Sequence, residues 1–221
     1  MTRFIAHLRL WQKFALVSAL ALTMMGVSTA LALQDRYQIW QSTQDEVSGL
    51  PAARQLIKLL QLTQQHRGLS ANWLSGNDAI GPTRQTRQNE VDAAAQATRA
   101  ALAALAAGSG RGDLLPLMDE IDTAWRSLAT ASQARQIQPP ESFRRHGAVI
   151  AQELKLLDQV IDASGLVLDP EAGSYYLIVA TLDNLPHLAE SLGQARARGT
   201  AILASQTKTP DDQAFSSIIA S

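Results

Sequence analysis

The feature that most constrains the fold is a run of twenty residues without a charged side chain, Phe14–Leu33 (FALVSALALTMMGVSTALAL). As an α-helix rising about 1.5 Å per residue, this run spans roughly 30 Å, which is the thickness of the hydrocarbon core of a bilayer. A charge at the centre of such a helix costs about 2.5–3.5 kcal/mol, so the absence of charge is informative. We therefore predict a transmembrane helix over residues 14–33.

The charges around this run predict its orientation. Arg3, Arg9 and Lys13 precede it, whereas none of the 20 acidic residues lies in residues 1–33. Basic residues beside a membrane helix stay on the cytoplasmic side. We expect residues 1–13 to be a cytoplasmic basic N-terminus, and the chain from Gln34 onward to lie outside the cytoplasm.

A cleaved signal peptide is the main alternative for this segment, because Ala30-Leu31-Ala32 resembles a cleavage site. The apolar core of a signal peptide is typically about 7–15 residues long, which is shorter than this run. Both interpretations place the bulk of the chain across the membrane. A core helix of a soluble protein is the third interpretation, and it leaves the basic N-terminus unexplained.

The rest of the chain predicts an all-α fold, a helical bundle that follows the membrane helix. The sequence is rich in leucine and alanine and shows no sustained apolar–polar alternation between hairpin turns. We expect a break at Gly49-Leu50-Pro51, and a possible kink at Pro186 inside the last long helix. The predicted helices cover residues 34–50, 51–74, 83–107, 113–136, 141–164 and 172–204. We assign the sensor bundle to residues 34–209 and the start of a further helix to residues 210–221, and we expect the sequence to be part of a longer protein.

Composition and motifs exclude several functions. A formal net charge of −1 argues against general nucleic-acid binding, and the absence of cysteine excludes thiolate nucleophiles and Cys-ligated zinc. The chain has no GxGxxG, P-loop or nucleophile elbow. The four histidines show no metal-ligand spacing, so we predict no catalytic residues, no cofactor and no metal site.

Two arginines occupy positions where a helical bundle normally has apolar side chains. Arg67 belongs to a series spaced 4, 3, 4, 3, 4 along one helix face. Arg196 belongs to a second series with the same spacing, and Gln194-Ala195-Arg196 matches Gln65-His66-Arg67 as a weak internal repeat. The first series is Leu56, Leu60, Thr63, Arg67, Ser70 and Leu74, and the second is Leu185, Ala189, Leu192, Arg196, Gly199 and Leu203.

Two guanidinium groups that point into one pocket could hold an anion through bidentate hydrogen bonds. Small residues beside them, including Ser70, leave room for a ligand, and Arg198 is an alternative to Arg196 because it also precedes a glycine. The competing interpretation is structural pairing, because a buried guanidinium needs a partner. For Arg67 the candidate partners are Glu90 and Asp92, and for Arg196 they are Asp162, Asp169 and Glu190.

Two segments resemble a known family of sensors. Residues 59–77 (LLQLTQQHRGLSANWLSGN) resemble the arginine-bearing helix of nitrate- and nitrite-sensing (NIT-type) extracellular domains, with His66 in place of the usual Glu of Glu-Arg-Gly. Residues 164–203 (SGLVLDPEAGSYYLIVATLDNLPHLAESLGQARARGTAIL) resemble helical sensor regions of bacterial membrane receptors. These receptors include methyl-accepting chemotaxis proteins, sensor histidine kinases and diguanylate cyclases.

The resemblance implies the ligand-sensing part of a receptor in the bacterial inner membrane, with its bulk in the periplasm, and a chemotaxis transducer is the favoured whole. It also implies a homodimer and a small ligand, an anion among the candidates, held by arginines from two helices. Arg67 matches the first of these arginines, and Arg196 or Arg198 the second. A membrane-anchored helical scaffold that binds a protein partner, without a small ligand, is the alternative from another class.

Overall fold

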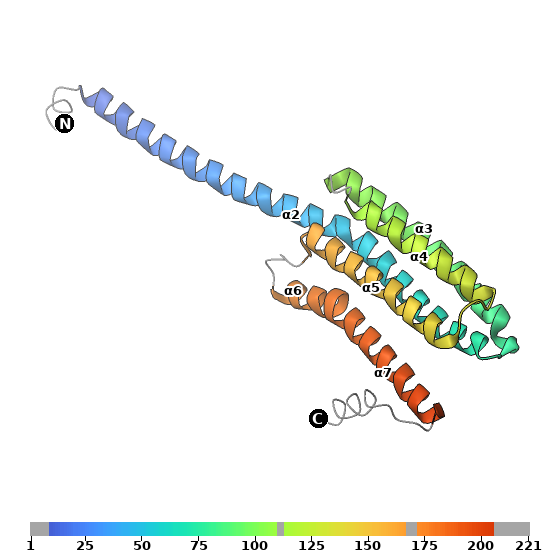
Figure 1. Cartoon of the computed structure of the whole chain (residues 1–221). Helices are drawn as coiled ribbons and strands as arrows, with labels where there is room; N and C mark the ends of the chain where they lie inside the picture. Colours follow the sequence, from blue (N-terminus) through green and yellow to red (C-terminus); the bar gives the residue numbers. More distant parts are fainter. Residues whose placement is uncertain (1–8, 110–112, 167–171, 206–221) are drawn as a thin grey trace. The chain divides into compact units, whose positions relative to one another are not determined.

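The computed structural model describes residues 9–109, 113–166 and 172–205, and within them it contains helices and no strand. The all-α prediction is therefore confirmed. The chain divides into two compact units, Met1–Asp45 and Glu46–Ser221. The helical elements are α2 (Leu10–Leu74), η1 (Asp78–Ile80), α3 (Gly81–Ser109), α4 (Leu114–Gln133), α5 (Pro139–Ala163), α6 (Ala172–Ile178), η3 (Val179–Asn184) and α7 (Leu185–Ser205) (Figure 1).

The first unit contains the apolar part of α2. The segment Leu10–Gln34 is long and apolar enough to cross a membrane, and none of it is buried against other parts of the protein. Its large side chains, such as Phe14, Leu22 and Met25, are mostly exposed. Burial of such apolar surface is favourable, and a lipid phase would provide it.

The second unit is a bundle in which four helices build one core. The C-terminal part of α2, α3, α4 and α5 alternate small and large apolar residues on their inward faces, which lets the helices approach closely. The α3–α4 and α4–α5 pairs are consecutive neighbours (Figure 1). The largest fully buried apolar side chains are Leu56, Leu59, Val91, Leu102, Met118, Leu128, Ile150, Leu156, Leu157 and Leu166.

The predicted break at Gly49-Leu50-Pro51 is wrong, because α2 runs through Pro51. Gly49 serves helix packing rather than a turn. It is buried, and a Cβ atom placed on it would lie 2.2 Å from the Cβ of Ser164. The glycine therefore lets α2 approach the end of α5 closely.

The last helical segment is irregular near the predicted kink. Instead of one helix over residues 172–204, the chain forms α6, the π-helical segment η3 and α7. Proline has no backbone N–H, so Pro186 cannot donate the usual bond to the carbonyl four residues earlier, and the wide turn lies directly before it. The predicted loop at Asp169 and the helix after Pro210 lie outside the described residues.

The inward face of α7 differs from the predicted one by one position. Leu185, Ala189 and Leu192 are exposed, whereas Pro186 and Glu190 are buried and Gly193 is half-buried. The spacing of 4 and 3 is retained but starts one residue later. In α2 the predicted face is correct for five of its six residues: Leu56, Leu60, Thr63, Arg67 and Ser70 are buried, and Leu74 at the end of the helix is half-buried.

Candidate functional site

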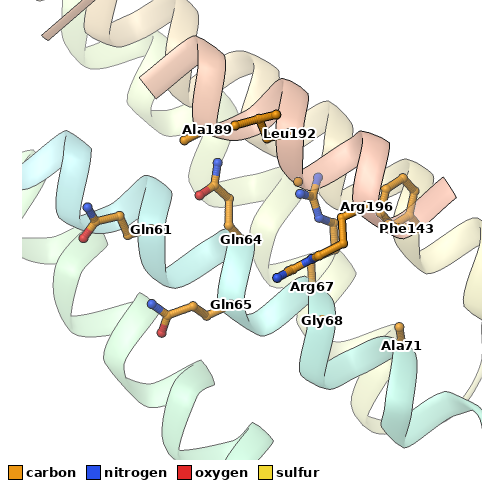
Figure 2. A pocket seen from close by; sticks show the side chains of 12 residues that line it. Gln61, Gln64, Gln65, Arg67, Gly68, Ala71, Phe143, Ala189, Leu192 and Arg196 are labelled. Carbon is orange, nitrogen blue, oxygen red and sulfur yellow. The ribbon is translucent and has the colours of Figure 1, made fainter. Parts of the chain in front are cut away.

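A cavity of about 460 Å³ lies where α7 crosses α2 and α5. Figure 2 shows its lining, which comes from three helices. Two arginines, one from α2 and one from α7, contribute to it, and none of the 12 lining residues is acidic. The lining residues are Gln61, Gln64, Gln65, Arg67, Gly68, Ala71, Phe143, Ala189, Leu192, Gly193, Arg196 and Ala197.

Arg67 lies at the inner side of this cavity and is only 6% exposed. Its guanidinium forms a bidentate ion pair with Glu190 of α7, with Nη1–Oε1 and Nη2–Oε2 distances of 2.6 and 3.1 Å. The guanidinium also lies over the Phe143 ring, 4.8 Å from its centroid. A Cβ atom on Gly193 would lie 3.1 Å from Nη2, so this glycine makes room for the arginine.

Glu190 accepts four hydrogen bonds, and three of them come from α2 and join it to α7. Besides the two from Arg67, Gln64 donates to its Oε2 at 3.0 Å and Gln194 donates to its Oε1 at 2.8 Å. A carboxylate that accepts several charge-assisted bonds in a buried setting is held firmly in place. The Arg67–Glu190 ion pair therefore holds α7 against α2.

Structural pairing of Arg67 is confirmed, but both predicted partners are wrong. Glu90 pairs with Arg87 along α3 at 2.5 Å, and Asp92 accepts a hydrogen bond from the Trp125 indole at 2.7 Å. The partner of Arg67 is Glu190, which is one of the residues predicted to pair with Arg196. The shift of the α7 face by one residue explains the difference, because it turns Glu190 inward.

The other predicted site residues lie in different environments. Arg196 is exposed and lines the same cavity as Arg67, and it forms no ion pair with any residue that the structure describes. Arg198 is also exposed but does not line the cavity. Ser70 is fully buried, lies 3.3 Å from Nδ1 of His66, and is not part of the cavity lining.

A buried chain of hydrogen bonds lies behind Arg67 and joins α3, α2 and α5. His146 Nδ1 lies 2.7 Å from the carbonyl oxygen of Ser142, so this nitrogen carries a proton and donates it. Its Nε2 must then accept from His66 Nδ1, 2.9 Å away. His66 Nε2 in turn accepts from Arg84 Nη1 at 3.1 Å. Every ring nitrogen is satisfied when both imidazoles are neutral.

The environment of the two histidines favours this neutral state. Burial lowers the pKa of His66 to about 2, assisted by His146 and Arg84. Burial also lowers the pKa of His146 to about 4, against the opposing bond to Ser142, with further lowering by Arg67, Arg145 and Arg84. The two imidazoles thus act as neutral spacers between guanidinium groups.

Arg84 leaves an uncompensated positive charge inside the bundle. It is 2% exposed, and its hydrogen bonds go to the neutral groups of His66, Gln88 and Gln85. No carboxylate pairs with it among the described residues, and its Nε has no partner there. Buried cations of this kind raise the electrostatic potential around them, which favours anions nearby.

Glu153 of α5 is a buried acid that stays neutral. Burial raises its pKa to about 8, against the opposing hydrogen bond from Thr63 and with a smaller further rise from Glu190. Thr63 Oγ1 lies 2.8 Å from Glu153 Oε1 and 3.0 Å from the carbonyl of Leu59. Thr63 donates to Glu153 Oε1, and its single proton cannot serve the Leu59 carbonyl at the same time.

The two histidines predict acid sensitivity of the bundle. The pKa of each ring is lower in the folded than in the unfolded protein, so the stability that they contribute is complete above about pH 6.5. It is lost as the pH falls from there toward the folded pKa values, about 4 for His146 and about 2 for His66. The free energy of unfolding should therefore fall as the pH is lowered from about 6.5 to 4, because the unfolded chain takes up protons that the two buried rings do not. NMR titration of the imidazole signals checks this, and a midpoint near 6.5 for His66 would contradict it.

Sequence reasoning missed the partners of Arg67 and the histidine chain, although a usable signal exists. Ser142, His146 and Glu153 share one face of α5 with Val149, Ile150 and Leu157, as Arg67 shares a face of α2 with Leu60. Polar residues at apolar positions on two helices therefore predict a shared buried polar layer. Which of these polar residues contact one another depends on the register between helices that are 80 or more residues apart in the sequence. No local sequence pattern encodes this register.

Comparison with known proteins decides the family. The model of the family described as nitrate and nitrite sensing (NIT) matches residues 58–221, which is most of the chain. The chain belongs to the NIT family. A search of curated proteins and a search of solved structures found no match. The NIT match begins in α2 just before Arg67 and includes all the cavity residues, and it confirms the resemblance drawn from the two sequence segments.

NIT domains are sensor domains of signalling receptors rather than catalytic domains. An apolar N-terminal helix that is long enough to span a bilayer fits such a membrane receptor. The cavity between α2 and α7 is thus the candidate ligand site of a NIT sensor.

Proposed function

We propose that the chain is the ligand-sensing part of a bacterial transmembrane receptor, and that a small anion, nitrate or nitrite, binds in the cavity between Arg67 and Arg196. One observation carries the proposal: arginines from two helices line one cavity that has no acidic residue in its lining. The buried charge of Arg84, which is hydrogen-bonded to His66 next to Arg67 in the sequence and has no carboxylate partner among the described residues, supports it. NIT-family membership supports nitrate and nitrite as the first ligands to test.

The chemistry of guanidinium suits such ligands. Its planar fork of N–H donors matches a planar oxyanion through two parallel hydrogen bonds, and it keeps its charge at any physiological pH. The side-chain amides of Gln64 and Gln65 line the same space and offer further donors. The apolar ring of Phe143 excludes water from one side of the Arg67 guanidinium and strengthens its electrostatic interactions.

Anion binding at Arg67 has to compete with Glu190, which already occupies both of its terminal nitrogens. We propose that the anion displaces this carboxylate. The bonds that Arg67 donates to Glu190 then no longer hold α7 on α2, and the population of bundle states shifts. A ligand can move this equilibrium only by its difference in affinity for the two packings, typically 1–3 kcal/mol in allosteric systems.

The receptor that we propose has its membrane helix at residues 14–33 and its sensor bundle, residues 34–209, in the periplasm of a bacterium, anchored in the inner membrane. A methyl-accepting chemotaxis protein that works as a homodimer is the favoured whole, and a histidine kinase or diguanylate cyclase is the alternative. In each case a shift of the bundle reaches the output part through small slides or rotations of helices.

Arg196 and Arg198 offer a matched pair of variants, because both are exposed on α7 but only Arg196 lines the cavity. We expect Arg196→Ala to weaken nitrate binding roughly tenfold or more, since a charge-assisted contact is worth about 1.5–3 kcal/mol. Arg198→Ala should leave the affinity within roughly twofold. Isothermal titration of the full chain in detergent micelles measures both, with sodium chloride as the control for ionic strength.

Two outcomes would contradict this proposal. Equal effects of the two substitutions would place the anion away from the cavity. Absence of heat with nitrate, nitrite and small dicarboxylates, together with an unchanged melting temperature, would leave the helical scaffold that binds a protein partner.

A further inference from the structure

A second group of potential ligands lies on α5, η3 and α7, outside the cavity. Asp158 of α5, Asp183 of η3 and His187 of α7 each offer one donor atom, and these three atoms all lie within 4.8 Å of one another. His187 Nε2 is 3.2 Å from Asp158 Oδ1. All three residues belong to the part of the chain that the structure describes.

The arrangement comes from the fold rather than from a local run of acids. Asp183 and His187 are four residues apart, across the junction of the π-helical segment with α7, whereas Asp158 comes from the preceding long helix. This explains why the sequence showed no metal-ligand spacing. A π-helical turn inserted in a helix is frequently found at functional sites, because it realigns side chains.

The donor set and its geometry suit a divalent transition-metal ion. Zinc takes imidazole nitrogen and carboxylate oxygen together at about 2.0–2.2 Å, which places tetrahedral donor atoms about 3.4 Å apart. The observed separation of 3.2 Å between His187 and Asp158 already meets this value, and small rotations bring Asp183 into range. Two carboxylates also balance the charge of the ion, whereas Mg²⁺ and Ca²⁺ prefer oxygen ligands alone.

We propose that Asp158, Asp183 and His187 form a binding site for a divalent transition-metal ion, with Zn²⁺ as the probe, that links α5 to the start of α7. The three donors leave a coordination position for water, and the half-exposed side chains of His187 and Asp158 give the ion a route of entry. His187 lies three residues before Glu190, so a bound ion holds the turn of α7 that precedes the Arg67 ion pair.

The test is isothermal titration of the full chain, without a histidine tag and after treatment with a chelator, with zinc chloride and with magnesium chloride. We expect one Zn²⁺ per chain and a higher melting temperature in zinc. His187→Ala and Asp183→Asn should each weaken Zn²⁺ binding at least roughly tenfold, since even outer-shell partners of a metal are worth 10–100-fold. Asp162→Asn, at an exposed acid of α5, is the matched control and should leave binding unchanged.

Three results would overturn the proposal. The first is no Zn²⁺ binding by the unmodified chain. The second is Zn²⁺ binding that His187→Ala does not weaken, which places the ion elsewhere. The third is Mg²⁺ binding as tight as Zn²⁺ binding, because it would show that the imidazole of His187 is not a ligand. Circular dichroism of each variant confirms that loss of binding is not loss of fold, and none of these readouts depends on anion binding.

Discussion

Glu190→Gln is expected to raise the affinity for nitrate roughly 10- to 100-fold. The Glu190 carboxylate occupies both terminal nitrogens of Arg67 in the structure. The amide of glutamine has the same shape but no charge, so it competes less well with an anion, and a hydrogen bond between charged groups is worth about 1.5–3 kcal/mol. Isothermal titration of the full chain measures the change.

The Glu190→Gln variant should also change the melting temperature of the protein, and nitrate should reverse this change. Without nitrate, Glu190→Gln leaves the Arg67 guanidinium buried without a counter-charge, and the melting temperature should fall. Saturating nitrate should restore it, because a ligand that binds the folded state stabilises it by mass action. Glu153→Gln is the matched control at pH 6, since it replaces a buried carboxyl that is already neutral. Unchanged affinity in Glu190→Gln would contradict displacement of the carboxylate.

Glu153→Gln is expected to change how the stability of the bundle depends on pH. The pKa of Glu153 is raised from 4.5 to about 8 in the folded protein, so the unfolded chain loses this proton first as the pH rises. Stability from this group therefore falls as the pH rises from about 4.5 to 8. Glutamine never ionises, so the variant should be the more stable protein at pH 8.

Chemical denaturation of both proteins between pH 5 and 9 tests this expectation. The histidine pair makes stability rise with pH up to about 6.5, and Glu153 makes it fall above that value. The unmodified protein should therefore be most stable near pH 6.5, and the Glu153→Gln variant should lose less stability above it. Parallel pH profiles for the two proteins would show that Glu153 is ionised in the fold.

Local patterns predicted the helices well because each one depends on residues close in sequence. The inward face of α2, with Arg67 among Leu60 and Thr63, follows from spacing alone. The predicted inward face of α7 is wrong by one residue, because the π-helical turn before Pro186 changes which side chains point inward after it. The break expected at Pro51 is absent, because the packing of the bundle outweighs the loss of one backbone hydrogen bond.

Partner choice within the buried layer could not be predicted in the same way. The sequence placed Arg67 in the interior and required a counter-charge, which is a local argument. Glu190 is 123 residues away, and it became the partner only through the register of α7 on α2. The contact between His66 and His146 depends in the same way on the register of α5 on α2. Chemistry of this kind is set by tertiary packing rather than by periodicity.

The central claim is that a small anion binds Arg67 in place of Glu190. Its most direct test is a crystal structure of the protein grown with sodium nitrate. We expect nitrate in the cavity, within hydrogen-bond distance of the guanidinium groups of Arg67 and Arg196, with the Glu190 carboxylate moved away from Arg67. Nitrate bound elsewhere, or an intact Arg67–Glu190 pair at saturating nitrate, would contradict it.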